Sequence, residues 1–184
     1  MNAGMGKGRK PEVTEVIDAS DVLEVTEAMP EDADAAGVVP VADSRTCALV
    51  AAKAADSKKA TDIMVQQVSA LMNVTDYFVI ATAANNRQVD AIIEAIEEAE
   101  RQQCGVKPLS REGTDDGIWA LLDYGNFVVH VFQPEARDYY KLELLWNKAP
   151  VVDLAEAGIT DAVYSERISD LLEKLASGAH VSDI

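Results

Sequence analysis

Two short apolar runs joined by a turn make up residues 119–132, Trp-Ala-Leu-Leu-Asp-Tyr-Gly-Asn-Phe-Val-Val-His-Val-Phe. The Gly and Asn between the runs suit a tight reversal between antiparallel strands. The stretch therefore predicts a β-hairpin with strands over 119–123 and 127–132. Because side chains alternate along a strand, Val128, His130 and Phe132 are expected on one face of the sheet and their neighbours on the other.

The segments around this hairpin carry the patterns of further strands and helices. Strands are predicted over 62–68, a mixed apolar and polar run, and over 76–82, where aromatic and β-branched residues dominate. Helices are predicted over 45–59, from Asn85 or Asn86 to about Gln103, from Pro134 to Tyr140 or further, and over 161–176. This order of elements predicts an α/β fold with a mixed β-sheet flanked by helices.

The composition indicates one globular domain with charged tails. The chain has 184 residues, of which 48% are hydrophobic and 26% charged, as in ordinary globular proteins. Its net charge of −16 divides into −7 over 1–43, −4 over 44–150 and −5 over 151–184. Residues 11–43 contain ten acidic side chains and no Lys, Arg or aromatic residue. We therefore expect a disordered acidic extension over 1–43, a core domain over 44–154 and a C-terminal extension with one helix over 155–184.

The charge and the apolar content exclude several classes of partner. Binding to nucleic acid requires clustered Lys and Arg side chains that neutralise its phosphates. A chain this acidic is therefore expected to bind no DNA and little or no rRNA directly. No apolar run approaches the length of a membrane span, and no apolar segment typical of a signal peptide follows the basic start of the chain. We expect a cytoplasmic protein without membrane contact.

The cysteines and histidines form no recognisable metal or redox motif. Cys47 and Cys104 lie 57 positions apart without a C-x-x-C pair, and His130 and His180 are the only histidines. Neither a disulfide framework nor a Cys/His zinc cluster is expected, and no metal or cofactor is predicted. A histidine within an apolar strand is most often a satisfied core group, less often an interface residue and rarely a catalytic one.

The sequence offers little support for catalysis. It contains neither the phosphate-binding motif G-x-x-x-x-G-K-S/T nor the dinucleotide-binding motif G-x-G-x-x-G, and no G-x-S-x-G nucleophile elbow. Asp115 and Asp116 are adjacent, but the Gly and Thr residues around them are typical of a solvated turn. Five Trp and Tyr residues fall within 28 positions and suit either an interface or the core: Trp119, Tyr124, Tyr139, Tyr140 and Trp146.

Several long, ordered matches give the chain a specific resemblance to a known family. They are the hairpin run 119–132, Pro134, Arg137, Tyr139-Tyr140, Leu142-Glu-Leu-Leu-Trp146, Ala149-Pro150, Asp76-Tyr-Phe-Val-Ile-Ala-Thr82, and Lys107-Pro-Leu109 before Glu112-Gly113. Over about residues 46–154, the sequence resembles the ribosomal silencing factor family, also called Iojap. Both extensions lie outside this match.

The resemblance implies a nucleotidyltransferase-like fold without the transferase activity. It also implies that the protein binds the large ribosomal subunit at ribosomal protein L-fourteen, keeps the small subunit from joining, and lowers translation when nutrients are short. A working transferase of this fold needs a Gly-Ser pair followed by two carboxylates at alternate strand positions. The core contains no Gly-Ser pair and no Asp-x-Asp, so we expect no enzymatic activity.

Residues at the family's motif positions are the candidates for partner contact, and no catalytic residue is assigned. Ribosomal proteins are generally basic, so acidic groups beside aromatic anchors would complement them. The alternative is a divergent nucleotidyltransferase that uses Asp115, Asp116 or Asp123 with Mg²⁺ and a nucleotide. When free, the protein is also a candidate for homodimer formation through the same surface. The contact candidates are Asp76, Tyr77, Glu112, Trp119, Asp123, Tyr124 and His130.

Overall fold

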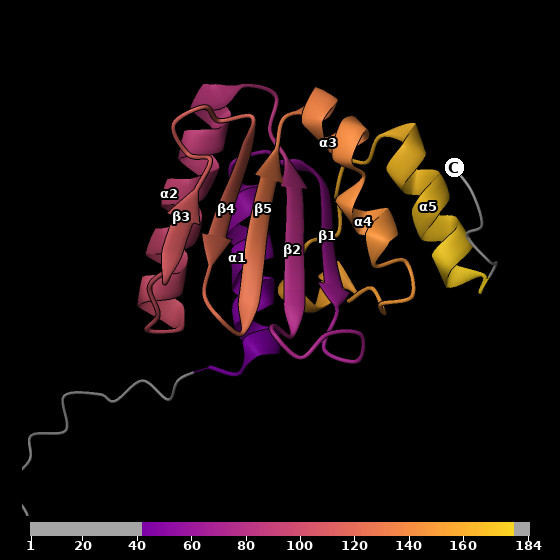
Figure 1. Cartoon of the computed structure of the whole chain (residues 1–184), viewed down its shortest axis with the longest axis horizontal. Helices are drawn as coiled ribbons and strands as arrows, with labels where there is room; N and C mark the ends of the chain where they lie inside the picture. The colour runs from indigo at the N-terminus through magenta and orange to yellow at the C-terminus, as the bar shows by residue number, and fades with distance from the viewer. Residues whose placement is uncertain (1–41, 179–184) are drawn as a thin grey trace, which may run out of the picture. The chain divides into compact units, whose positions relative to one another are not determined.

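Five strands form one mixed sheet in the order β1-β2-β5-β4-β3 (Figure 1). The computed structural model describes residues 42–178, which belong to one compact unit. β2 and β5 run parallel in the interior of the sheet, and the other neighbouring pairs are antiparallel. The predicted α/β fold and the hairpin over 119–132 are confirmed. The strands are β1 (Thr61–Gln67), β2 (Tyr77–Thr82), β3 (Ser110–Glu112), β4 (Trp119–Asp123) and β5 (Phe127–Phe132).

Helical segments flank this sheet, and the three predicted before residue 141 lie within two residues of their expected bounds. Asp43 caps the first of them by accepting a hydrogen bond from the Thr46 amide. The described structure therefore includes the last two residues of the segment expected to be disordered, Ala42 and Asp43, while the prediction for residues 1–41 lies outside the described residues. The segments are α1 (Ser44–Ser57), α2 (Asn86–Gln103), α3 (Pro134–Tyr140), α4 (Leu142–Leu145), η1 (Leu154–Ala157) and α5 (Glu166–Ala176).

Three short elements, β3, α4 and η1, were not predicted. All three residues of β3 are exposed, so its sequence lacks the apolar alternation on which strand prediction depends. α4 and η1 have four residues each, which is too short for a helical hydrophobic period to repeat. Their positions are set by packing against the sheet rather than by local sequence.

α5 begins later than the expected residue 161 and docks on the core. The backbone amide of Asp62 donates to the carbonyl of Val163, and its carboxylate accepts a hydrogen bond from the amide of Ser165 at 2.6 Å. These two contacts hold the segment before α5 against β1, so the helix starts only at Glu166. Its buried residues then pack on β1 in a cluster made of Met64, Ile168 and Leu171.

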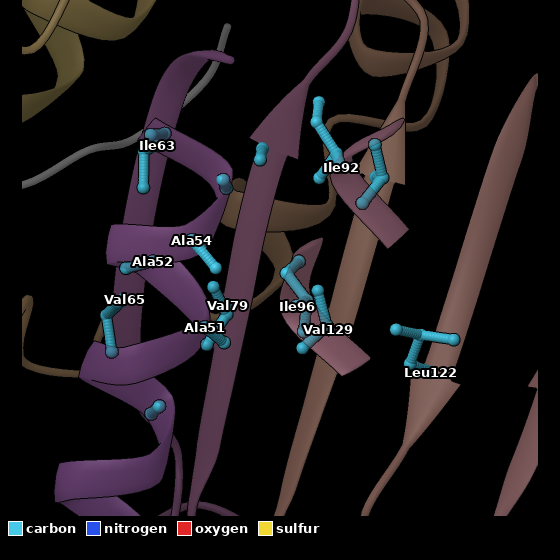
Figure 2. Close-up of a cluster of buried hydrophobic side chains, with 14 of the residues drawn as sticks. Ala51, Ala52, Ala54, Ile63, Val65, Val79, Ile92, Ile96, Leu122 and Val129 are labelled. Carbon is cyan, nitrogen blue, oxygen red and sulfur yellow. The ribbon is translucent and has the colours of Figure 1, made fainter. Parts of the chain in front are cut away.

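Small side chains let α1 lie close to one face of the sheet. The alanines on its inner side are completely buried, and Figure 2 shows Ala51 and Ala52 beside Val65 and Val79 of the first two strands. α2 covers the same face next to α1, and Figure 2 shows its Ile96 beside Val129 of β5. This face therefore carries the main hydrophobic core, and none of it is available to a partner without unfolding a helix.

The opposite face is covered only in part, by α3 and α4, and a buried ion pair holds them there. Arg137 Nε lies 2.9 Å from Glu143 Oε2, and its Nη1 donates to Thr82 Oγ1 at 3.1 Å. Both charged side chains are buried. Arg167 of α5 also pairs with Glu143, and Gln66 of β1 donates to the Glu143 carbonyl at 3.0 Å. Removing one partner of such a pair costs about 3–5 kcal/mol, so this network fixes α3 and α4 to β1 and β2.

Exposure on this second face rises from β2 to β3. Ile80 of β2 and its neighbour His130 are buried, Leu121 beside them in β4 is half-buried, and Glu112 in β3 is exposed. Figure 1 shows no helix in front of β4 and β5. We call this part of the sheet the open face; its residues are Glu112, Trp119, Leu121, Asp123, Val128 and His130.

A glycine fixes the turn that leads from β3 into β4. Gly113 has a φ of +66°, and a Cβ at this position would overlap the backbone carbonyl oxygen of Trp119. The close approach ties the edge strand to the start of β4. It therefore positions both Glu112 and Trp119, which lie on either side of the turn.

Replacing Gly113 with alanine is expected to destabilise the protein by more than about 3 kcal/mol, because both the left-handed backbone and the overlap with the Trp119 carbonyl oppose a Cβ. Gly105→Ala is the matched control: Gly105 has a φ of +68° but no atom within 4 Å of the added Cβ. Only the backbone cost of about 1 kcal/mol remains there. Urea unfolding of the three proteins measures both losses, and equal losses would contradict the close approach at Gly113.

Candidate functional site

Aromatic rings run across the open face from the centre of the sheet to its rim. Trp119 stacks on Phe132 with ring centroids 4.7 Å apart and contacts Tyr140 at 4.7 Å. Tyr140 in turn meets Tyr139 at 5.0 Å. The two tyrosines are 48% and 80% exposed, and Ile118 next to Trp119 is 55% exposed. Partly exposed rings supply rigid contact area in protein interfaces, so this rim is the first candidate for a binding site.

One hydrogen bond orients the indole of Trp119. Its Nε1 donates to Nδ1 of His130 at 3.2 Å. The imidazole is itself held edge-on against Phe78 of β2, with ring centroids 5.1 Å apart. Because Nδ1 accepts this bond, the neutral imidazole carries its proton on Nε2. The buried His130 side chain therefore holds the half-buried Trp119 ring in place.

Burial keeps His130 neutral. Desolvation lowers its pKa from 6.5 to about 4, and the nearby Arg137 guanidinium acts in the same direction. A protonated Nδ1 would have no lone pair to accept the Trp119 hydrogen bond. The structure thus favours the interpretation of His130 as a core histidine that supports an interface residue over a catalytic role.

Two carboxylates lie on the same face of the sheet as the Trp119 ring. Glu112 is exposed on the edge strand β3, and Asp123 is half-buried at the end of β4, where its Oδ1 accepts a hydrogen bond from the Gly125 amide at 2.7 Å. In the sheet, Glu112 pairs with Leu121 and Asp123 pairs with Val128. Directly paired residues share a face, so both acidic groups lie on the open face together with Trp119.

Four of the seven predicted contact residues therefore share the open face. Tyr77 and Tyr124 do not: both are buried on the opposite face, in the cluster with α1 and α2. Tyr124 follows directly after Asp123, but neighbouring residues of an extended chain point to opposite sides. Its ring stacks on Phe127 with centroids 4.5 Å apart. The four residues on the open face are Glu112, Trp119, Asp123 and His130.

Asp76, the remaining candidate, lies outside the open face. It is half-buried just before β2, and its carboxylate accepts a hydrogen bond from Ser44 Oγ at 2.9 Å. Its backbone amide donates to the Asn126 carbonyl in the turn of the hairpin. Asp76 thus links the start of α1 to the turn of the hairpin, so its role in the fold is structural.

The carboxylates of the enzyme alternative form no metal site. Asp115 and Asp116 are exposed in the turn between β3 and β4, as expected, while Asp123 lies at the far end of β4. Within residues 42–178, the one group of three ligand-type side chains close enough to share a metal ion does not include them.

That group consists of Cys47, Glu100 and Cys104, all buried, and sequence analysis missed it. Cys47 lies in the first turn of α1, Glu100 lies in the last turn of α2, and Cys104 is the residue that ends α2. The side-by-side packing of the two helices brings the cysteines together across 57 positions of sequence. The burial of Glu100, an acidic residue in a helix rich in exposed glutamates, was not visible in the hydrophobic pattern.

The open face is a surface rather than a pocket. A cavity of about 590 Å³ lies elsewhere, between α5 and the segment 147–154, and its lining includes none of the seven predicted contact residues. Small-molecule sites are usually concave and enclose most of their ligand.

Along the part of the chain that the structure describes, no helix has the length and apolar content to cross a membrane.

An α/β domain with rings and carboxylates on one uncovered sheet face has the features of a macromolecule-binding domain. Comparison with protein families identifies it further: the chain belongs to the ribosomal silencing factor family. The family model, described as "Ribosomal silencing factor during starvation", matches residues 41–174. This range includes η1 and most of α5, which the sequence analysis assigned to an extension beyond the core domain.

Individual relatives agree with this assignment. The ribosomal silencing factor RsfS of Bacillus subtilis is 40% identical over 105 residues, which is 57% of this chain and 88% of the relative. The chloroplastic protein Iojap of Zea mays is 38% identical over 116 residues, 61% of this chain and 49% of the relative. A crystal structure of a Chromobacterium violaceum protein superposes with a TM-score of 0.55 at 33% identity, covering 57% of this chain and 87% of that one.

Acidification is expected to destabilise the protein through His130. Its pKa is about 4 in the folded protein against 6.5 for an ordinary histidine, so between these values the unfolded chain binds more protons and stability falls as the pH falls. From pH 7 to pH 4, the free energy of unfolding of the wild type should drop by about 3 kcal/mol more than that of His130→Asn, which keeps an acceptor but does not titrate. Urea unfolding across this range measures the difference, and parallel curves for the two proteins would show that His130 is not held neutral by the fold.

Proposed function

We propose that the protein binds the large ribosomal subunit through its open face, with ribosomal protein L-fourteen as the direct contact, and thereby blocks association with the small subunit. The family's description as a silencing factor during starvation supports a role in repressing translation when nutrients are limiting. A mouse relative, 36% identical over 92 residues that make up 49% of this chain and 40% of the relative, carries the name "Mitochondrial assembly of ribosomal large subunit protein 1". That name supports the choice of subunit.

The observation that carries the proposal is the combination of acidic and aromatic groups on the open face. Glu112 and Asp123 share this face with Trp119, which begins β4 at the end opposite Asp123, and the rim beside Trp119 includes Tyr140. The six residues of the open face include two carboxylates and no Lys or Arg. Such a surface complements a basic protein, since opposite charges guide association and fix the register while the rings supply contact area. It would repel the phosphates of rRNA, so a protein is the favoured direct partner.

The proposed mechanism is occupancy and requires no reaction. A stable interface buries about 800 Å² on each partner, and the open face with its tyrosine rim would form the central part of such an interface. α1 and α2, on the other side of the sheet, would then project into the space that the small subunit needs. The proposal therefore treats the protein as non-enzymatic and cytoplasmic. The same face is the proposed contact for pairing of two copies when no subunit is present.

The proposal separates the seven predicted residues into two roles. Glu112, Trp119 and Asp123 would touch the partner, and His130 would hold Trp119 from below. Tyr77, Tyr124 and Asp76 would act indirectly, because the tyrosines are buried on the other face and Asp76 links α1 to the hairpin.

Reversing the charge of Glu112 tests this assignment. Glu112→Lys should weaken binding to isolated large subunits by about tenfold or more, because a lysine on the open face would face a basic partner. Glu112 is exposed, so the substitution is expected to leave the fold intact. Co-sedimentation of the purified variant with large subunits over a range of concentrations measures the affinity.

Glu94→Lys is the matched control. Glu94 is also exposed, but it lies on α2, which covers the opposite face of the sheet. Both variants change the net charge by the same amount, so a general electrostatic effect would weaken both equally. Binding that is lost only in Glu112→Lys supports the open face, whereas equal affinities for the two folded variants would remove the open face as the contact surface.

A further inference from the structure

The cluster of Cys47, Glu100 and Cys104 joins the two helices of the main core. One ligand-type atom from each side chain lies within 4.8 Å of the other two. The three side chains are 3%, 0% and 0% exposed. In the described part of the chain, no second group of this kind occurs. Neither the family's name nor the proposed ribosome contact assigns a function to this cluster. It lies between α1 and α2, on the face of the sheet opposite the open face.

The carboxyl group of Glu100 is the anomaly in this cluster. Neither of its oxygens has a hydrogen-bond partner, although both are buried. Burial raises its pKa from 4.5 to about 7, while the Cys104 thiol and the Ala51 backbone, which lie nearby without completing a hydrogen bond, act in the opposite direction. The neighbouring Arg101 is engaged at the surface with Glu98. Folded proteins seldom bury a polar side chain without a partner, so this carboxyl group points to a ligand.

We propose that Cys47, Glu100 and Cys104 bind a zinc ion. Zn²⁺ accepts thiolate and carboxylate ligands together, with bonds of about 2.3 Å to sulfur and about 2.0–2.2 Å to oxygen. In a tetrahedral site these bonds separate the ligand atoms by about 3.5–3.8 Å. The present separations of at most 4.8 Å therefore need to close by little more than an ångström, which side-chain rotation supplies.

The ligand set favours Zn²⁺ over other ions. Mg²⁺ and Ca²⁺ prefer oxygen ligands throughout, and Cu(I) prefers sulfur alone. On binding, each thiol releases its proton to the solvent, and the cation neutralises most of the charge that the two thiolates and the carboxylate would bring into the core. Three protein ligands leave a fourth position for a water molecule. The ion would join the first turn of α1 to the end of α2.

A disulfide between the two cysteines is the competing use of the same atoms. It would require an oxidant and would remove both thiolates, and it would leave the Glu100 carboxyl group with no partner. The zinc site accounts for all three side chains. The disulfide is therefore treated as an outcome that the experiment must distinguish.

The test uses the full-length protein, reduced, stripped of metal with a chelator and then desalted. Titration with Zn²⁺ should give tight binding of about one equivalent per chain and an increase in Tm, because a ligand that binds only the folded state stabilises it. Co²⁺ in place of Zn²⁺ should produce a thiolate-to-metal charge-transfer absorption, which reports sulfur ligation directly in the wild type and needs no variant.

Variants then assign the ligands. The Cys47→Ala/Cys104→Ala double variant should lose the charge-transfer band and the stoichiometric zinc, and Glu100→Gln should keep the thiols but bind about tenfold or more weakly. Glu98→Gln, on the exposed side of the same helix, is the control and should bind like the wild type. Glu100→Gln also preserves the shape of the side chain, so a loss of affinity in this variant is not a loss of the fold.

Three results would overturn the proposal. Wild-type protein with reduced thiols that shows no charge-transfer band with Co²⁺ has no such site. Undiminished zinc binding by the double cysteine variant would place the metal elsewhere on this acidic chain. Rapid formation of a Cys47–Cys104 disulfide in air, with no zinc uptake by the reduced protein, would identify the cluster as a redox pair instead. None of these results affects the proposed ribosome contact, because that contact does not depend on the metal.

Discussion

The buried ion pair between Arg137 and Glu143 is the constraint on which the arrangement of this domain depends. Two charges in the interior are tolerable only when they are paired and hydrogen-bonded, so their contact allows α3 and α4 a single position on the sheet. Thr82, Gln66 and Arg167 bind the same pair from three further elements. As a result, α3 and α4 pack against β2 and the last residue of β5, Phe132, and extend no further across the sheet. The open face exists because this network ends the helical layer before it reaches β4.

The uncovered half of the sheet is rigid because its largest side chain is held by three neighbours. Trp119 stacks on Phe132, contacts the tilted ring of Tyr140 and donates a hydrogen bond to the neutral His130. A ring held in this way loses little conformational freedom when a partner binds, which lowers the entropic cost of association. The glycine turn before β4 extends this order to the edge strand, where Glu112 lies. Binding through this face would therefore use preformed geometry.

The sequence predicted most of the fold because its main elements carry strong local signals. The hairpin has two apolar runs joined by a Gly-Asn turn, and α2 has an isoleucine stripe with Gly105 after its end, so each could be placed from its own residues. β3 could not, because an exposed edge strand of three residues is held by pairing with β4 alone. The seven contact candidates remain a prediction, and their sequence positions could not show which face each occupies, because that division follows from strand register. Tyr124 and Asp123 are adjacent in sequence and lie on opposite sides of the sheet. The cysteine and glutamate cluster was missed because it is formed only when two helices pack together.

The central claim is that this domain silences the ribosome by occupying the large subunit. Its most direct test mixes purified large and small subunits under conditions that favour whole ribosomes, after the large subunits have been saturated with the purified protein, and follows association by light scattering. The account predicts that the fraction of whole ribosomes falls in proportion to the occupied large subunits. Unchanged association at full occupancy of the large subunit would contradict it.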